Sequence, residues 1–175
     1  MLLPETFDLL VLGLGSTGLA VARWGAAHLG ERVRSVTVYG GAGSAPSAET
    51  DALGAAGVRF VFGTELVQGD DDVCVASPGI SEFSAFFARG REHALAIMGE
   101  PEFAWRLSPE HWIAVTGTNG KTTTTSLINH ILNESGRSSV AVGNIGLAPI
   151  AAVDDRAPGS WFAAELSSYQ LATTS

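Results

Sequence analysis

Short apolar runs alternate with amphipathic segments along the chain, and this alternation predicts an α/β protein. Five apolar runs among the first 100 residues have the length of buried strands: Phe7–Gly13, Val33–Tyr39, Val58–Phe62, Asp72–Ala76 and Leu95–Met98. Helices are predicted between them at Thr17–Leu29, Ala48–Ala56 and Ser81–Glu92. Strands that alternate with helices form parallel sheets covered on both faces, so we expect such a sheet here.

A second series of the same kind follows the polar, proline-containing stretch Ser108–His111. Its predicted elements are strands at Trp112–Thr116, Ser139–Gly143 and Trp161–Glu165 and a helix at Thr122–Ser135, in which Leu127, Ile128, Ile131 and Leu132 fall on one face. We therefore expect two domains, residues 1–107 and residues 108–175. Three strands make a small core, so the second domain is expected to be incomplete, as in a truncated chain or part of a longer polypeptide.

Composition narrows the possible functions. The 175 residues carry a net charge of −8, which argues against a broad nucleic-acid-binding face. The single cysteine, Cys74, excludes a disulfide framework and fits a reducing compartment. No apolar run reaches the length of a membrane span, and the first residues lack the basic region of a signal peptide. We expect a cytoplasmic monomer with no membrane or nucleic-acid partner.

The first glycine motif, Gly13-Leu-Gly-Ser-Thr-Gly18, follows a predicted strand and opens a predicted helix. This arrangement is typical of a turn that binds a phosphate through its backbone N–H groups. A dinucleotide site would also place an acid at the end of the second strand, where the sequence reads Tyr39-Gly-Gly41. The motif therefore favours a phosphorylated ligand other than NAD, and the alternative is a turn whose glycines serve packing alone.

The second glycine motif is the stronger signal. A strand runs into Thr116-Gly-Thr-Asn-Gly120, and Lys121 and Thr122 follow at the start of a helix. Backbone amides can surround phosphates there, the lysine can reach the β and γ oxygens, and the threonine hydroxyl can bind Mg²⁺. Val115 stands where the usual P-loop has its first glycine, so the loop is a shortened variant.

Glu165 ends the apolar run that begins at Trp161. The carboxyl end of a strand in a parallel sheet is where ligand-binding groups are presented. We expect Glu165 either to hold the Mg²⁺ whose other protein ligand is Thr122, or to be a solvated acid at a strand end.

Taken together and in order, the motifs resemble the Mur ligase family. The resemblance spans the chain and rests on Gly13–Gly18, Ser77-Pro-Gly-Ile80, Gly99-Glu-Pro-Glu-Phe103, Thr116–Thr124, Gly143-Asn-Ile-Gly146 and Glu165-Leu-Ser-Ser-Tyr-Gln-Leu171. It implies a Rossmann-like first domain that binds the UDP of the substrate, followed by the beginning of a P-loop α/β domain that binds ATP. The second and last motifs look most like the member that adds D-glutamate.

That member is an ATP-dependent amide ligase of peptidoglycan precursor synthesis. The resemblance implies that ATP phosphorylates the carboxylate of UDP-N-acetylmuramoyl-L-alanine and that the amine of D-glutamate attacks the acyl phosphate. It also implies that the D-glutamate site, the adenine pocket and further metal ligands lie outside these 175 residues, so that this chain alone is expected to be inactive. Another Mur ligase, or a nucleotide-binding module without chemistry, remains an alternative.

Site residues follow from the matched motifs. Lys121 is the catalytic candidate, since it would stabilise the transferred phosphoryl group. The ATP-binding candidates are Gly117, Thr118, Asn119, Gly120, Lys121, Thr122, Thr123 and Thr124. Candidates for the UDP substrate are Ser16, Thr17, Ser77, Pro78, Gly79, Asn144 and Gln170. Those for the metal are Thr122 and Glu165. The turn at Tyr39-Gly-Gly41 departs from the Asp-Thr/Ser-Arg-like turn of the family's uracil site, so uracil recognition is expected to be altered.

Overall fold

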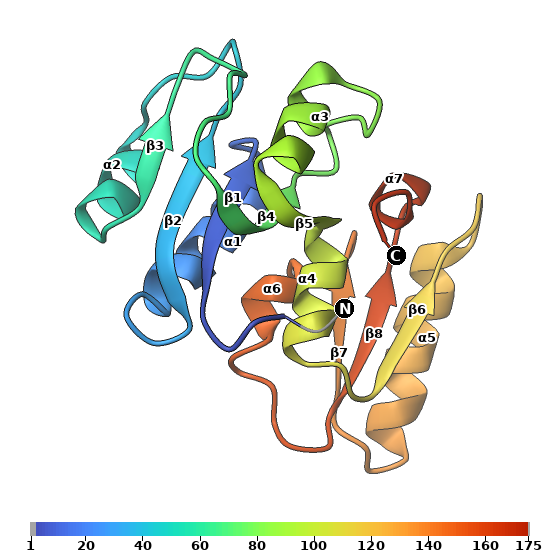
Figure 1. The fold of residues 1–175 in the computed structure, drawn as a ribbon. Helices are drawn as coiled ribbons and strands as arrows, with labels where there is room; N and C mark the ends of the chain where they lie inside the picture. The colour runs from blue at the N-terminus through green and yellow to red at the C-terminus, as the bar shows by residue number, and fades with distance from the viewer. Residues whose placement is uncertain (1–2, 175) are drawn as a thin grey trace.

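The computed structural model describes residues 3–174 and confirms the α/β fold, with two all-parallel sheets (Figure 1). The first sheet has the order β3-β2-β1-β4-β5 and the second the order β6-β8-β7. In Figure 1 the blue-to-green part of the chain forms the first sheet, and the yellow-to-red part forms the second beside it. None of the helices in the described residues is long and apolar enough to cross a membrane.

The first sheet follows the strand–helix alternation of the sequence. Its strands are β1 (Phe7–Leu12), β2 (Val33–Tyr39), β3 (Arg59–Val61), β4 (Asp71–Ala76) and β5 (Ala94–Gly99). Its helices are α1 (Ser16–Ala27), α2 (Ala48–Ala55), α3 (Ala85–Glu92) and α4 (Glu100–Leu107). The chain moves outward from β1 to β2 and β3, then returns to β4 on the other side of β1. This reversal creates a crevice at the carboxyl ends of β1 and β4.

The second sheet comprises β6 (Trp112–Val115), β7 (Ser139–Gly143) and β8 (Trp161–Glu165). The helices associated with it are α5 (Lys121–Glu134), α6 (Pro149–Ala152) and α7 (Ser168–Leu171). Because β8 lies between β6 and β7, its carboxyl end is flanked by the ends of both neighbours.

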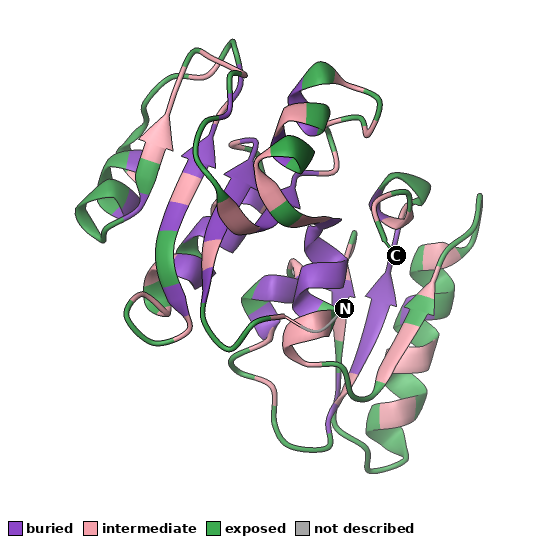
Figure 2. Cartoon of the chain, viewed as in Figure 1, coloured by how far each residue is buried: buried purple, intermediate pink, exposed green. Residues whose placement is uncertain are grey.

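Alternating side chains of the central strand β1 enter different cores on the two faces of the first sheet. Leu9 and Val11 pack with α1 and α4, whereas Leu10 and Leu12 pack with α3. Figure 2 shows this strand almost wholly buried. The core on the α1 face continues through Ile150 of α6 toward the second sheet, so α4 and α6 lie between the two sheets.

All eight predicted strands are confirmed, but the predicted helices need three corrections. The helix expected from Ser81 begins only at Ala85, because the Ser84 side chain accepts a hydrogen bond of 3.1 Å from the Phe87 N–H and caps it. The sequence pattern predicts no helix at α4 or α6. The helix α5 is confirmed, but its apolar residues Leu127 and Ile131 are 54% and 55% exposed.

Candidate nucleotide-binding site

The turn between β6 and α5 has the backbone of an anion-binding loop. Gly117 and Gly120 have φ angles of +147° and +75°, in a region that side chains disfavour, and α5 begins directly after the second glycine. The side chain of Lys121 folds back over the turn, where its Nζ donates a hydrogen bond of 2.8 Å to the carbonyl oxygen of Gly117. The Lys121 ammonium group and the amino end of the 14-residue helix α5 therefore both lie at this turn.

Glu165 lies next to this turn because of the strand register. It pairs with Val115 of β6 on one side and with Gly143 of β7 on the other. The residue is 5% exposed, and its Oε2 atom is buried without a hydrogen-bond partner among the described residues. A buried carboxylate oxygen without a partner is costly, and a cation would satisfy it.

Close packing fixes the backbone around Glu165. A Cβ atom at Gly143 would lie 2.2 Å from the Glu165 carbonyl oxygen, and that oxygen accepts a hydrogen bond of 2.9 Å from the Asn144 N–H. Gly143 has a φ of +98°. A side chain at this position would therefore displace the end of β8 that carries the carboxylate.

A cavity of about 460 Å³ opens beside the turn. It is lined by Thr116, Gly117, Thr118, Lys121, Ser167, Ser168 and Tyr169. The structure thus brings three predicted ATP-binding residues together with the start of α7. Asn119, Gly120, Thr122, Thr123 and Thr124 are exposed on the turn and the first turn of α5, and none of them lines this cavity.

The first glycine turn is tightly packed on one side and open on the other. A Cβ atom on Gly18 would lie 2.1 Å from the carbonyl oxygen of Gly13, whereas one on Gly15 would meet nothing within 4 Å. Ser77 packs beneath the turn, and its buried Oγ has no hydrogen-bond partner among the described residues. Ser77, one of the predicted UDP ligands, thus lies under the turn. Two others, Ser16 and Thr17, lie at the start of α1, where Ser16 is exposed and Thr17 is half-buried.

Two cavities border this region. One, of about 470 Å³, lies against Gly13 and Gly15 and the loop after β2. The other, of about 680 Å³, lies between the loop after β4, which includes Pro78 and Gly79, and the segment that includes α7. Of the predicted UDP-substrate residues, only Pro78 and Gly79 line either cavity, and both line the second.

The two remaining predicted UDP ligands lie near β8. Asn144 is exposed, and its backbone is held to Glu165. Gln170 is buried, and its Oε1 accepts hydrogen bonds of 2.8 Å and 3.0 Å from the N–H and the hydroxyl of Ser167. Gln170 thus forms a capping box at the start of α7.

The residues that line these cavities include Tyr169 and Glu65, which were not among the predicted ligands. Tyr169, which is 75% exposed, borders both the cavity with Lys121 and the cavity with Pro78 and Gly79. Its place within the last matched motif was a signal that could have identified it. Glu65 lines the cavity beside Gly13, and no motif marks it.

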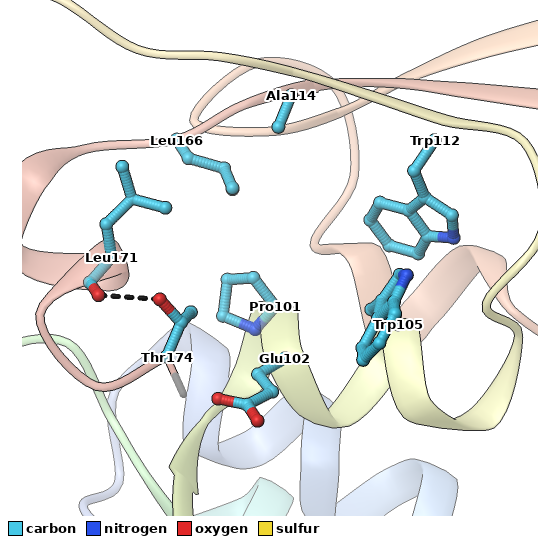
Figure 3. A pocket seen from close by; sticks show the side chains of 8 residues that line it. All are labelled: Pro101, Glu102, Trp105, Trp112, Ala114, Leu166, Leu171 and Thr174. Atoms are coloured by element: carbon cyan, nitrogen blue, oxygen red, sulfur yellow. Dashed lines mark hydrogen bonds between the residues drawn. The ribbon is translucent and has the colours of Figure 1, made fainter.

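A fourth cavity, of about 290 Å³, lies between α4 and the second sheet (Figure 3). It is mainly apolar, with Pro101 and Trp105 on one side and Trp112 and Leu166 on the other. No predicted site residue lines it. In residues 3–174, moreover, no three His, Cys, Asp or Glu side chains gather as a metal site.

Comparison with known proteins adds independent information. Residues 115–175 match the Mur ligase middle domain. UDP-N-acetylmuramoylalanine–D-glutamate ligase from Geobacillus kaustophilus is 36% identical over 93% of this chain and 36% of the relative. The enzyme of the same name from Gloeobacter violaceus is 39% identical over 92% of this chain and 36% of the relative. The chain thus spans about a third of the length of these relatives.

A solved structure similar to this chain is UDP-N-acetylmuramate–alanine ligase MurC from Thermotoga maritima. It is 23% identical, with a TM-score of 0.49, over 92% of this chain and 37% of that one. The match to the middle domain and the sequence likeness over most of the chain agree with the order of the motifs. The chain therefore belongs to the Mur ligase family.

Proposed function

We propose that these residues are the UDP-substrate-binding part and the beginning of the ATP-binding part of a ligase that joins D-glutamate to UDP-N-acetylmuramoyl-L-alanine. Relatives that bear this enzyme's name match more than nine-tenths of the chain. On this proposal residues 1–107 are one domain and residues 108–175 begin the next. The D-glutamate site would lie in another part of the enzyme, which would act as a monomer.

One observation carries the proposal. Ser168 and Tyr169 line both the cavity that contains Lys121 and the cavity that contains Pro78 and Gly79. A phosphate donor held at the second glycine turn and an acceptor held by the loop after β4 would therefore meet across α7. Phosphoryl transfer requires this kind of positioning of two ligands.

The proposed reaction has two steps. The acceptor's carboxylate oxygen attacks the γ-phosphorus of ATP, the bond to the β–γ bridging oxygen breaks, and ADP leaves. The amine of D-glutamate then attacks the carbonyl carbon of the acyl phosphate, and the tetrahedral intermediate expels phosphate to leave the amide. Lys121 would stabilise negative charge on the transferred phosphoryl group from its position over Gly117.

Mg²⁺ would neutralise the charge of the ATP phosphates and be held by Thr122 and Glu165. The buried Oε2 of Glu165, which has no hydrogen-bond partner in the part of the chain that the structure describes, fits this role, as does the exposed Thr122 in the first turn of α5. The UDP substrate would be held by the residues predicted for it, which are Ser16, Thr17, Ser77, Pro78, Gly79, Asn144 and Gln170. Of these, Ser77 and Gln170 would act by shaping the site. A cytoplasmic setting agrees with the single, buried cysteine.

The proposal is tested by Lys121→Ala in the complete polypeptide that carries these residues. We expect D-glutamate-dependent phosphate release to fall by about 100-fold or more, because a charged donor to the transferred group is lost. Binding of UDP-N-acetylmuramoyl-L-alanine, measured by calorimetry, should persist. Arg137→Ala, which removes an exposed cation beyond the other end of α5, is the matched control. Turnover retained in the Lys121 variant would exclude this role for the lysine.

A further inference from the structure

The cavity at the carboxyl ends of β1 and β2 has the setting of a nucleoside site. Its lining includes Gly13 and Gly15 after β1, residues 40–45 after β2, and Ile80 after β4. Gly13 and Ile80 place it beside the crevice between β1 and β4, where the strand order reverses, and its volume of about 470 Å³ is in the range of small-ligand sites. Gly15 leaves the backbone beside the cavity uncovered.

Tyr39, at the end of β2, occupies the position where many nucleotide-binding sheets have an acid that binds ribose hydroxyls. In this chain Tyr39 is 1% exposed, and its ring belongs to the core beneath α3. Its hydroxyl accepts a hydrogen bond of 3.0 Å from the Gln68 N–H. Tyr39 therefore anchors the segment after β3 and does not itself line the cavity.

That segment brings Glu65 to the cavity. Thr64 forms an antiparallel bridge with Gly41, and the Gly63 N–H donates a hydrogen bond of 3.1 Å to Ser44 Oγ. The carbonyl oxygen of Glu65 accepts one of 3.2 Å from Arg89 of α3. The backbone of Glu65 is thus tied to the loop after β2 and to α3.

The Glu65 side chain is available for a ligand. It is half-buried and lines the cavity, and among residues 3–174 its carboxylate has neither an ion pair nor a hydrogen bond. A carboxylate accepts hydrogen bonds only, and the paired 2′ and 3′ hydroxyls of a ribose are two neighbouring donors.

We propose that Glu65 binds the ribose hydroxyls of the nucleoside diphosphate whose phosphates lie at the first glycine turn. The acid that β2 lacks is thereby supplied from the segment after β3. This inference rests on the proposed function, in which the first sheet binds a uridine diphosphate. It assigns the discrimination of ribose from deoxygenated sugars to a specific side chain.

The test measures binding of two probes, UDP and 2′,3′-dideoxyuridine 5′-diphosphate, to the 175-residue chain by calorimetry. The wild-type chain should prefer UDP by about tenfold or more, as expected for hydrogen bonds to a charged group. Glu65→Ala should remove most of this preference and leave binding of the dideoxy probe unchanged or stronger. Glu65→Gln should retain part of the preference, because its amide oxygen still accepts hydrogen bonds.

Glu31→Ala, at an exposed acid near the amino end of β2, is the matched control and should retain the full preference. Circular dichroism establishes that each variant is folded. If the wild-type chain binds neither probe, the proposed function of the first sheet fails and the inference fails with it. If the wild-type chain binds UDP and Glu65→Ala keeps the same preference, only the assignment of Glu65 is overturned.

Discussion

Burial of Glu100 predicts a folded state that loses stability as the pH rises. The residue is 1% exposed at the contact between α4 and α6, where its Oε1 accepts a hydrogen bond of 2.6 Å from the Ile150 N–H. Burial raises the pKa of Glu100 from 4.5 to about 7, although the hydrogen bond from Ile150 acts in the opposite direction. The carboxyl group is therefore protonated in the folded chain under conditions where the unfolded chain has lost that proton.

The sign and size of the effect follow from proton binding. Between pH 4.5 and pH 7 the folded chain binds more protons at Glu100 than the unfolded chain, so the free energy of unfolding falls as the pH rises. The contribution of Glu100 to the free energy of unfolding is complete below pH 4.5 and is lost as the pH rises through about 7. The difference between the pKa of 4.5 in the unfolded chain and about 7 in the folded chain corresponds to a loss of about 3 kcal/mol in the free energy of unfolding.

Glu100→Gln isolates this contribution, because glutamine stays neutral and keeps an oxygen that can accept from Ile150. Urea denaturation at pH 5 and pH 8 measures the free energy of unfolding of each form. We expect similar stability at pH 5 and a variant more stable than wild type by ~2–3 kcal/mol at pH 8. Glu134→Gln, at an exposed acid, should show no such divergence. A difference between wild type and Glu100→Gln that is equal at both pH values would refute the argument.

Two further predictions concern packing, and urea denaturation measures both. Arg156 donates hydrogen bonds to backbone carbonyls of residues 108–111 and lies 4.3 Å from the ring centre of Phe162. Arg156→Lys should therefore destabilise the chain by about 1–3 kcal/mol, and an unchanged midpoint would contradict this. Gly143→Ala should cost more than Gly159→Ala, by about 2 kcal/mol. Both glycines have positive φ angles, but a Cβ atom would collide with the β8 backbone only at the first.

The strands were predictable from the sequence because each is a buried apolar run between helices. Helices were less predictable where their ends depend on local contacts. In α4, Pro101 lies in the first turn, where it is compatible with a helix, and the helix follows β5 without an intervening loop. A proline so close to a strand gave no helical signal. The four residues of α6 are too few to show a periodicity.

The candidate site was predictable where its residues are consecutive or follow a rule of sheet geometry. The second glycine turn and Lys121 are contiguous, and Glu165 could be placed beside them because parallel strands end at one edge of a sheet. Cavities formed by separate segments were not predictable in this way. Glu65 reaches its cavity through the bridge between Thr64 and Gly41, a contact that no local pattern encodes.

The contact between Glu100 and Ile150 lies close to a second contact, which involves the cavity lined by Pro78, Gly79 and Tyr169. Adjacent to Glu100, the Gly99 N–H donates a hydrogen bond of 3.3 Å to the carbonyl oxygen of Thr173, which lines that cavity with Pro78. Successive residues at the end of β5 therefore hold the second sheet at two points, one on α6 and one just beyond α7. The opposite walls of this cavity follow strands of different sheets, and these two hydrogen bonds join the two parts of the chain. The acceptor site of the proposed ligase thus lies beside the junction in which Glu100 is buried.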